Sequence, residues 1–400
     1  MSQRSTTTAL SVVTAVSLLL AGCSSTSERA SGTTLDARGC ITDFDANTDY
    51  FPDKSTLSDA KNFSIDYHGS YQVLTVNQPF PGASPESYVL VKCGAPEPEL
   101  SGGLATAPKI TTPITSLYSG STTHLPLITE LGQLDILTGV ANAGNVNGED
   151  IRARIAEGKI TEYASGKTVN VEKVVTADPD VLMTQGTDDP SYVKLRSAGI
   201  PVVANAEYLE STALGRAEWV KMMAALTGTE AEAAALFTTI RSDYEKVAAT
   251  AAGVAKQPVL PGTMYQGTWY MPAGGSYVGQ LLRDAGASYP WEGDPSTGSL
   301  QLNFETVYTQ GGTAPTWIVM SDWASTADAT DEDQRYGQLT AVKDGQVWSG
   351  TKDVGPDGGN NFYQLGVLRP DLVLGDLVAI VHPELSPDHE FAFYRPVPRA

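Results

Sequence analysis

Polar and aromatic side chains follow the predicted strands of this 400-residue chain. In the first half of the chain they are Tyr118, Ser119, Thr122, His124, Asn142, Asn145 and Gln185. In the second half they are Tyr265, Trp269, Tyr270 and Trp323. Aromatic rings bury a large area with few rotamers, which suits flat chelates and macrocycles, although each ring taken singly is more typical of core packing. Together these residues are the predicted ligand-binding set.

The sequence holds no recognisable catalytic constellation, so we expect neither an enzyme nor a resident cofactor. It contains no G-x-S-x-G nucleophile elbow. Zinc or manganese needs three or four ligands, and of the four histidines only His124 falls on a predicted binding loop; the others are His68, His382 and His389. Binding of a free metal ion therefore stays an alternative without a defined ligand set.

Two short motifs resemble ligand-binding loops but lack residues that those loops require. The "ASGKT" stretch at 164–168 ends like a phosphate loop, but threonine replaces the leading glycine at position 161. The stretch 43–54 spaces its acids like a calcium loop, but it lacks the sixth-position glycine and ends in Lys54 instead of a bidentate glutamate. We interpret both stretches as surface turns.

The chain is strongly acidic, with 46 aspartates and glutamates against 26 lysines and arginines and a net charge of −20. Such a balance argues against nucleic acid as a partner, because no basic patch is available to neutralise phosphates. It argues equally against electrostatic docking on an anionic bilayer. It does not identify the ligand.

The pattern of the chain predicts two similar α/β units. In residues 106–210, strands are expected at 109–119, 134–140, 180–184 and 200–205, and helices at 123–133, 169–179 and 190–199. In residues 253–400, strands are expected at 258–266 and 316–321, and helices at 276–287 and 303–312. Short loops between alternating strands and helices are typical of parallel sheets with crossover helices.

The segments around these units differ in composition. Residues 211–252 are rich in alanine, leucine, glutamate and lysine, which predicts a helical connector with a break near Gly228. Residues 36–105 carry short alternating runs at 70–76 and 87–91 and end in a Pro/Gly-rich linker. They predict a small β-rich module.

An internal repeat links the two units. The pattern Asn-x-Glu-x-Val occurs at 170–174 and again at 303–307, 133 residues later. We expect Asn170 and Asn303 to be N-caps, with Glu172 and Glu305 in the first helical turns, where a carboxylate complements the helix dipole. Two related lobes suggest a binding cleft between them.

The N-terminus predicts export and anchoring. Arg4 precedes an apolar run at 9–20, which is shorter than the roughly 20 residues of a membrane-spanning helix and suits a secretory signal. The run ends in Leu20-Ala21-Gly22-Cys23, which resembles the lipobox of bacterial lipoproteins and implies a lipid on Cys23. Residues 1–22 would then be the signal peptide and 23–35 a flexible tether. The alternative is an ordinary signal peptide.

The other two cysteines form an even pair. An exported chain meets an oxidising compartment, so Cys40 and Cys93 are predicted to form a disulfide within the β-rich module. Two buried free thiols are the alternative.

Residues 106–385 resemble the substrate-binding lipoproteins of ABC importers for iron–siderophore complexes, haem or cobalamin, the class III periplasmic binding proteins. The resemblance is carried by "TADPDVLMT", "LRSAGIPVV", "LTAVKDGQVW" and "RPDLVLGDLVAIVHPEL", in that order, together with the lipobox. It implies an α/β fold of two three-layer α/β/α lobes with mostly parallel sheets, joined by a long helix. The ligand would lie between the lobes, which close only slightly around it. Trp291 would also contact the ligand, because it falls where relatives carry a loop that lines the cleft. The module at 36–105 departs from the common pattern.

The same resemblance implies a function. The protein would capture an iron chelate, a ferric siderophore first and haem or cobalamin as alternatives, and deliver it to an ABC permease dimer with its cytoplasmic ATPase. Glu172 and Glu305 would dock on arginines of the permease, a role compatible with helix capping. The lipid on Cys23 would hold the protein at the extracytoplasmic face of the cell membrane. A run of arginines is missing, which favours a neutral or cationic ligand. An adhesive or structural lipoprotein is the alternative from another class.

Overall fold

The computed structural model describes residues 35–166 and 168–400. The signal peptide, Cys23 and all of the predicted tether except residue 35 lie outside the described residues. Within the described part of the chain, no helix combines the length and the hydropathy that a membrane span requires.

Lobe one is built on a parallel five-stranded sheet. Its strands, in the order β11-β10-β5-β6-β7, are Val202–Ala204, Val181–Thr184, Leu117–Ser119, Leu137–Val140 and Thr161–Glu162. Its helices are α1 (Leu125–Thr129), α2 (Glu149–Ala156), α3 (Val171–Ala177) and α4 (Pro190–Ser197). A two-stranded hairpin, β8 (Ala164–Ser165) and β9 (Thr168–Val169), precedes α3. Short parallel strands with a helix in each crossover are the predicted α/β pattern.

Lobe two repeats this plan with one antiparallel edge strand. Its strands, in the order β15-β12-β17-β18-β19, are Ala287–Ser288, Gln257–Pro261, Thr316–Val319, Val347–Ser349 and Arg395–Pro396. A smaller antiparallel sheet holds β13 (Thr263–Tyr265), β14 (Thr268–Pro272) and β16 (Ser299–Leu302). The helices are α8 (Tyr277–Asp284), α9 (Phe304–Gly311), α10 (Thr326–Glu332), α11 (Thr340–Asp344), α12 (Asn361–Gln364) and α13 (Pro370–Val381). Two mostly parallel α/β lobes confirm the predicted fold class.

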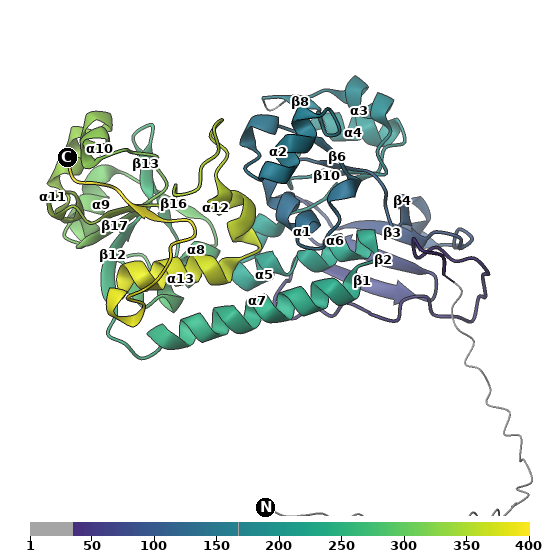
Figure 1. Ribbon diagram of the computed structural model, residues 1–400, viewed down its shortest axis with the longest axis horizontal. Coiled ribbons are helices and arrows are strands. Elements are labelled where there is room, and N and C mark those ends of the chain that lie inside the picture. The colour runs from purple at the N-terminus through teal and green to yellow at the C-terminus, as the bar shows by residue number, and fades with distance from the viewer. Residues whose placement is uncertain (1–34, 167) are drawn as a thin grey trace, which may run out of the picture.

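A helical connector joins the lobes. It comprises α5 (Ala213–Ala217), α6 (Val220–Thr227) and α7 (Glu230–Ala251). α6 ends because Gly228 adopts φ +71°, the left-handed conformation typical of a helix C-cap, at the predicted break. α7 has 22 residues, which corresponds to about 33 Å at 1.5 Å per residue. In Figure 1, α7 runs along one side of the molecule and packs against α6 and α13. A single long helix therefore spans both lobes.

The N-terminal segment forms a separate four-stranded sheet beside lobe one (Figure 1). Its strands, in spatial order, are β1 (Phe63–His68), β2 (Tyr71–Val76), β3 (Glu86–Lys92) and β4 (Lys109–Thr112). The predicted disulfide is confirmed, because the sulfur atoms of Cys40 and Cys93 are bonded at 2.06 Å. It fastens the start of the segment to the end of β3.

Buried carboxylates hold this sheet to the connector. The carboxylate of Glu218, which is fully buried, accepts hydrogen bonds from the backbone N–H groups of Asp59 and Ala60 at 2.7 and 2.8 Å. The ammonium of Lys221 donates to Glu218 at 2.7 Å. Glu210 accepts the N–H of Asn62 at 2.9 Å. Two carboxylates thus satisfy successive donors of one loop, which fixes the module against the helices.

Two predicted strands are each split between sheets. The expected strand 109–119 breaks at Pro113, where the backbone N–H needed for a continuous ladder is missing, so β4 joins the N-terminal sheet and β5 joins lobe one. The N-terminal sheet therefore extends past the predicted boundary at 105. The expected strand 258–266 breaks at Gly262, whose φ is +92° and where a Cβ would lie 2.3 Å from the carbonyl oxygen of Tyr270. β12 and β13 consequently belong to different sheets.

Candidate functional site

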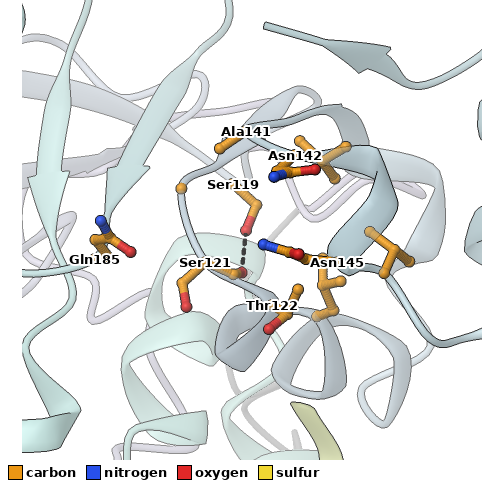
Figure 2. A pocket seen from close by; sticks show the side chains of 11 residues that line it. Ser119, Ser121, Thr122, Ala141, Asn142, Asn145 and Gln185 are labelled. Atoms are coloured by element: carbon orange, nitrogen blue, oxygen red, sulfur yellow. Dashed lines mark hydrogen bonds between the residues drawn. The ribbon is translucent and has the colours of Figure 1, made fainter. Parts of the chain in front are cut away.

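A polar cavity opens at the carboxyl ends of β5, β6 and β10 in lobe one. Its volume is about 170 Å³, and we call it the lobe-one cavity. Its polar lining comes from the end of β5 and from the loops that follow the three strands: Ser119, Ser121, Thr122, Asn142, Asn145 and Gln185 (Figure 2). The chain order of the sheet reverses between β5 and β10, and such switch points are where open α/β sheets bind ligands.

A hydrogen-bond chain fixes the loop after β5. Ser119 Oγ donates to the carbonyl oxygen of Ser121 at 2.8 Å and lies 3.0 Å from Nδ1 of His124. Within the described chain, Nε2 of His124 has no hydrogen-bond partner. Burial lowers the pKa of His124 to about 3, so the imidazole is neutral at physiological pH.

The loop after β5 also lies very close to the strand beside it. A Cβ on Gly120 would stand 2.7 Å from the carbonyl oxygen of Met183 in β10. Only glycine allows this approach without a shift of one backbone. It brings the loops after β5 and β10 together at the edge of the cavity.

A larger, mostly apolar cavity with several aromatic rings opens at the carboxyl ends of β12 and β17 in lobe two. Its volume is about 670 Å³, within the usual range of small-molecule sites, and we call it the lobe-two cavity. The sheet order reverses between β12 and β17, so this cavity also lies at a switch point. Its lining includes Tyr265, Tyr270, Tyr277, Tyr363, Tyr394, Trp323, Met264 and Met320.

Some of these rings are buried and others are exposed to solvent. Trp323 is 5% exposed, donates from Nε1 to Glu332 at 2.9 Å and packs on Trp317 with ring centroids 5.2 Å apart. Tyr265 and Tyr270 are 64% and 39% exposed. Large exposed rings beside a cavity are surfaces that a ligand can cover.

A buried ion pair supports one wall of the lobe-two cavity. The guanidinium of Arg216 lies 4.1 Å from the ring centre of Tyr277 and donates to Glu207 at 2.6 Å. Burial opposes the charge of Arg216, but the interactions with Glu207 and Tyr277 together outweigh that effect, so the pKa of Arg216 is raised. Glu207 comes from lobe one and Tyr277 from lobe two, so this contact joins the lobes at the base of the site.

Residues 353–364, which we call the interlobe segment, connect the two cavities. The side chain of Asn147 in lobe one donates to the Asp353 carboxylate at 2.9 Å, and its backbone N–H donates to Gln364 at 2.9 Å. Gly359 packs so closely that a Cβ would lie 2.4 Å from the carbonyl oxygen of Asn145 in the lobe-one cavity. Tyr363, in the same segment, lines the lobe-two cavity.

The sequence comparisons identify the family. A model of the family described as "Periplasmic binding protein" matches residues 114–354, which is more than half of the chain. This chain belongs to the periplasmic binding protein family. The match includes the loops of the lobe-one cavity and most of the lobe-two lining, so both cavities lie in the family's own fold.

Two curated relatives are named as lipoproteins. An uncharacterized lipoprotein of Methanocaldococcus jannaschii is 33% identical over 249 residues, covering 62% of this chain and 58% of the relative. A second uncharacterized lipoprotein of the same organism is 23% identical over 323 residues, covering 77% of this chain and 79% of the relative. The chain thus matches less than two thirds of the first relative's length.

Solved periplasmic binding proteins share the fold. A structure of a possible iron-binding protein from Staphylococcus epidermidis gives a TM-score of 0.53 at 16% identity, covering 68% of this chain and all of that chain. A periplasmic heme binding protein from Pseudomonas aeruginosa gives a TM-score of 0.51 at 15% identity, covering 68% of this chain and 93% of that chain. At such identities the likeness shows the architecture alone.

The structure brings eight of the predicted ligand-binding residues to the two cavities. Ser119, Thr122, Asn142, Asn145 and Gln185 line the lobe-one cavity. Tyr265, Tyr270 and Trp323 line the lobe-two cavity. Their role in binding stays a prediction, because the placement alone does not test it.

Four predicted residues lie elsewhere. Tyr118 faces the opposite side of its sheet and stacks on Tyr163, and His124 is fully buried behind the cavity loop. Trp269 is fully buried and donates to the carbonyl oxygen of Pro261 at 3.1 Å, so its ring is core. Trp291 lines neither cavity and packs against the lobe-two core. For the three buried side chains, Tyr118, His124 and Trp269, the expectation of direct ligand contact is corrected, and for the partly buried Trp291 it stays a prediction.

Other lining residues were not predicted from the sequence. Tyr277 begins α8, Tyr363 lies in α12, and Tyr394 precedes β19. None of the three directly follows a predicted strand, so the strand-end pattern does not point to them. A sequence signal that could have found Tyr277 and Tyr363 is a tyrosine within the first turn after a residue type that caps helices, Ser276 and Asn360.

The two repeated helix starts are confirmed as capped. The side-chain oxygens of Asn170 and Asn303 accept the N–H groups of Lys173 and Thr306 at 3.0 and 2.8 Å. Glu172 and Glu305 lie in the first turns and are exposed. Among the described residues, no group of three or more histidines, cysteines, aspartates or glutamates is placed to hold a metal ion.

Proposed function

We propose that this periplasmic binding protein captures an iron chelate, with a ferric siderophore as its ligand, between its two lobes. Two cavities at matching sheet edges carry this proposal. The lobe-one cavity offers hydrogen-bonding groups, and the lobe-two cavity offers rings. Both lie at switch points and are linked by the interlobe segment. A ligand large enough to touch both would be held by complementary chemistry on its two sides.

Delivery to an ABC permease and anchoring through Cys23 belong to the same proposal. Membership of the periplasmic binding protein family supports delivery, and two relatives named as lipoproteins support the anchor. A diacylglyceryl group would supply two acyl chains, which is enough for stable attachment to a membrane where one chain is marginal. The long α7 favours a small closing motion of the lobes, since it packs along both.

Titration of the purified mature protein with ferric siderophores tests the capture. Trp323 lines the lobe-two cavity and contacts Trp317, so a bound iron chelate should quench tryptophan emission and saturate at one chelate per chain. Binding should also raise the melting temperature, because a ligand at 100 times its Kd stabilises the folded state by about 2.7 kcal/mol. The proposal fails if no chelate, haem or cobalamin changes either the emission or the melting temperature.

A further inference from the structure

Among the residues that the structure describes, the only ionisable acidic or basic side chains that line the two cavities are carboxylates. The residues that line the lobe-one cavity include no ionisable side chain. Those that line the lobe-two cavity include two, and both are carboxylates, Asp322 and Glu332. Neither lining supplies a lysine, an arginine or a histidine. An anionic ligand would therefore meet no cation on either lining.

The arginines that touch lining residues are already neutralised. Arg395 donates to Asp322 at 2.7 Å and to the carbonyl oxygen of Trp323 at 3.0 Å. Arg216, beneath Tyr277, is paired with the buried Glu207. Both guanidiniums are committed to carboxylates of the protein.

A third arginine, Arg335, is also paired with a carboxylate of the protein. Arg335 touches Met264 and donates to Asp333 at 2.8 Å. Glu332, in contrast, forms no ion pair within the described residues and accepts a hydrogen bond from a neutral donor, the indole N–H of Trp323, at 2.9 Å. The lobe-two cavity is therefore mildly negative, in a chain whose net charge is −20.

The two cavities also differ in polarity. Amides and hydroxyls line lobe one, where Asn142, Asn145 and Gln185 can each donate and accept hydrogen bonds. Tyrosines, methionines and Trp323 line lobe two, where they offer flat and polarisable surfaces. A ligand that satisfies both cavities needs an apolar face and a hydrogen-bonding edge.

Building on the proposed function, we infer that the ligand is a neutral or cationic metal chelate with an amide or hydroxamate periphery. Its apolar face rests on the lobe-two rings and its periphery reaches the lobe-one amides. Burying a net anion without a compensating cation is costly, so carboxylate-rich and catecholate chelates are disfavoured. Ferric tris-hydroxamates and amide-bearing corrinoids share the favoured chemistry.

A charge-graded panel of chelates tests this inference. The purified mature protein is titrated calorimetrically with ferrioxamine, cobalamin, haem, ferric citrate and a ferric tris-catecholate. We expect ferrioxamine or cobalamin to bind at least 100-fold more tightly than the anionic members, and the better of the two identifies the source. Tighter binding of haem or another anionic chelate overturns this inference and leaves the proposed function standing. If no member binds, it is the proposed function that fails.

A charge added to the lobe-one lining sharpens the test. Gln185→Lys places an ammonium at that cavity, and we expect it to raise the affinity for the tris-catecholate at least tenfold. Gln310→Lys, at an exposed position of α9 outside both cavities, makes the same charge change and should leave that affinity within twofold. Equal effects of the two variants would show that only overall charge matters and would overturn the assigned orientation.

A second variant removes a negative charge from the lobe-two lining. Glu332→Gln keeps an oxygen acceptor for the indole N–H of Trp323 and loses the negative charge. We expect it to weaken binding of the cationic form of ferrioxamine several-fold and to leave uncharged cobalamin unaffected. An unchanged affinity for cationic ferrioxamine would contradict a role for this carboxylate.

Discussion

Two exposed tyrosines of the lobe-two cavity lie on the small antiparallel sheet. Tyr265 ends β13 and Tyr270 lies within β14, and both rings are exposed, so a ligand can cover them. The double change Tyr265→Ala, Tyr270→Ala should weaken binding of a ferric tris-hydroxamate at least tenfold, because both aromatic contacts are lost. Calorimetric titration measures the loss.

Tyr308 provides a matched control for this pair. It is 37% exposed, stacks on Phe304 and lies outside both cavities. Tyr308→Ala should leave the affinity unchanged. Equal losses in the control and in the double variant would mean that the tyrosines act through stability and not through contact.

His124 predicts a pH dependence of stability. Its pKa falls from 6.5 to about 3 on burial, so below pH 6.5 the unfolded chain binds a proton that the native chain does not. The free energy of unfolding should therefore fall by about 1.4 kcal/mol per pH unit as the pH drops from 6.5 toward 3. Between pH 7 and pH 5, the free energy of unfolding measured with urea should fall by about 2 kcal/mol less in His124→Asn than in the parent protein. Equal pH slopes would contradict the buried neutral imidazole.

Neighbouring residues show what the sequence could and could not determine at this scale. The caps Asn170 and Asn303 were predictable, because an N-cap depends on local chemistry. Trp269 and Tyr270 were both predicted to face the ligand, but adjacent strand residues point to opposite faces. Only the packing of β14 against the core decides that Trp269 is buried and Tyr270 is exposed.

At the scale of elements, the breaks in strands were harder to predict than their existence. Strands β10, β11 and β17 fall within their predicted ranges, because continuous apolar runs identify buried parallel strands. The split at Gly262 was missed, since a glycine inside a β-rich run reads equally well as part of the strand. Which sheet a strand joins depends on contacts distant in the sequence, such as the bond from the N–H of Ile114 to Leu226 at 2.9 Å.

The loop before β1 depends on the connector for its hydrogen bonds. Glu218→Gln would turn an amide group toward backbone donors at 58–60 and leave Lys221 without its carboxylate. Breaking a buried ion pair costs about 3–5 kcal/mol, so we expect a lower urea midpoint and faster proteolysis at residues 55–62. Glu232→Gln, an exposed change on α7, should do neither. Unchanged proteolysis of Glu218→Gln would show that the apolar contact between Phe63 and Trp219 suffices to hold the module.

At the scale of the whole molecule, the two lobes and the connector followed from the sequence, and the place of the N-terminal sheet did not. Alternating strands and helices predict each lobe locally. The sheet packs through one continuous apolar core shared with the connector and both lobes, which no local pattern reveals.

Delivery can be separated from binding through the repeated acids. Glu172 and Glu305 lie in first turns of related helices and line neither cavity. The double change Glu172→Ala, Glu305→Ala should abolish uptake of the chelate by cells and leave the affinity of the purified protein unchanged. Each loss should cost only about 0.3–1 kcal/mol through the helix dipole.

The control for the docking acids is another exposed pair. Glu232→Ala, Glu245→Ala removes the same charge from α7, including one first-turn acid. It should leave uptake normal. Normal uptake by the Glu172, Glu305 double variant would show that these two acids are only caps.

The central claim is that the two cavities together bind a metal chelate. The most direct measurement incubates the metal-free mature protein with spent medium of its native host, re-isolates the protein, and records its metal content and visible absorption. The account predicts one metal ion per chain with the absorption band of its chelate, and a loss of both in Tyr265→Ala, Tyr270→Ala. A colourless, metal-free protein, or equal loading of the parent and the double variant, would contradict it.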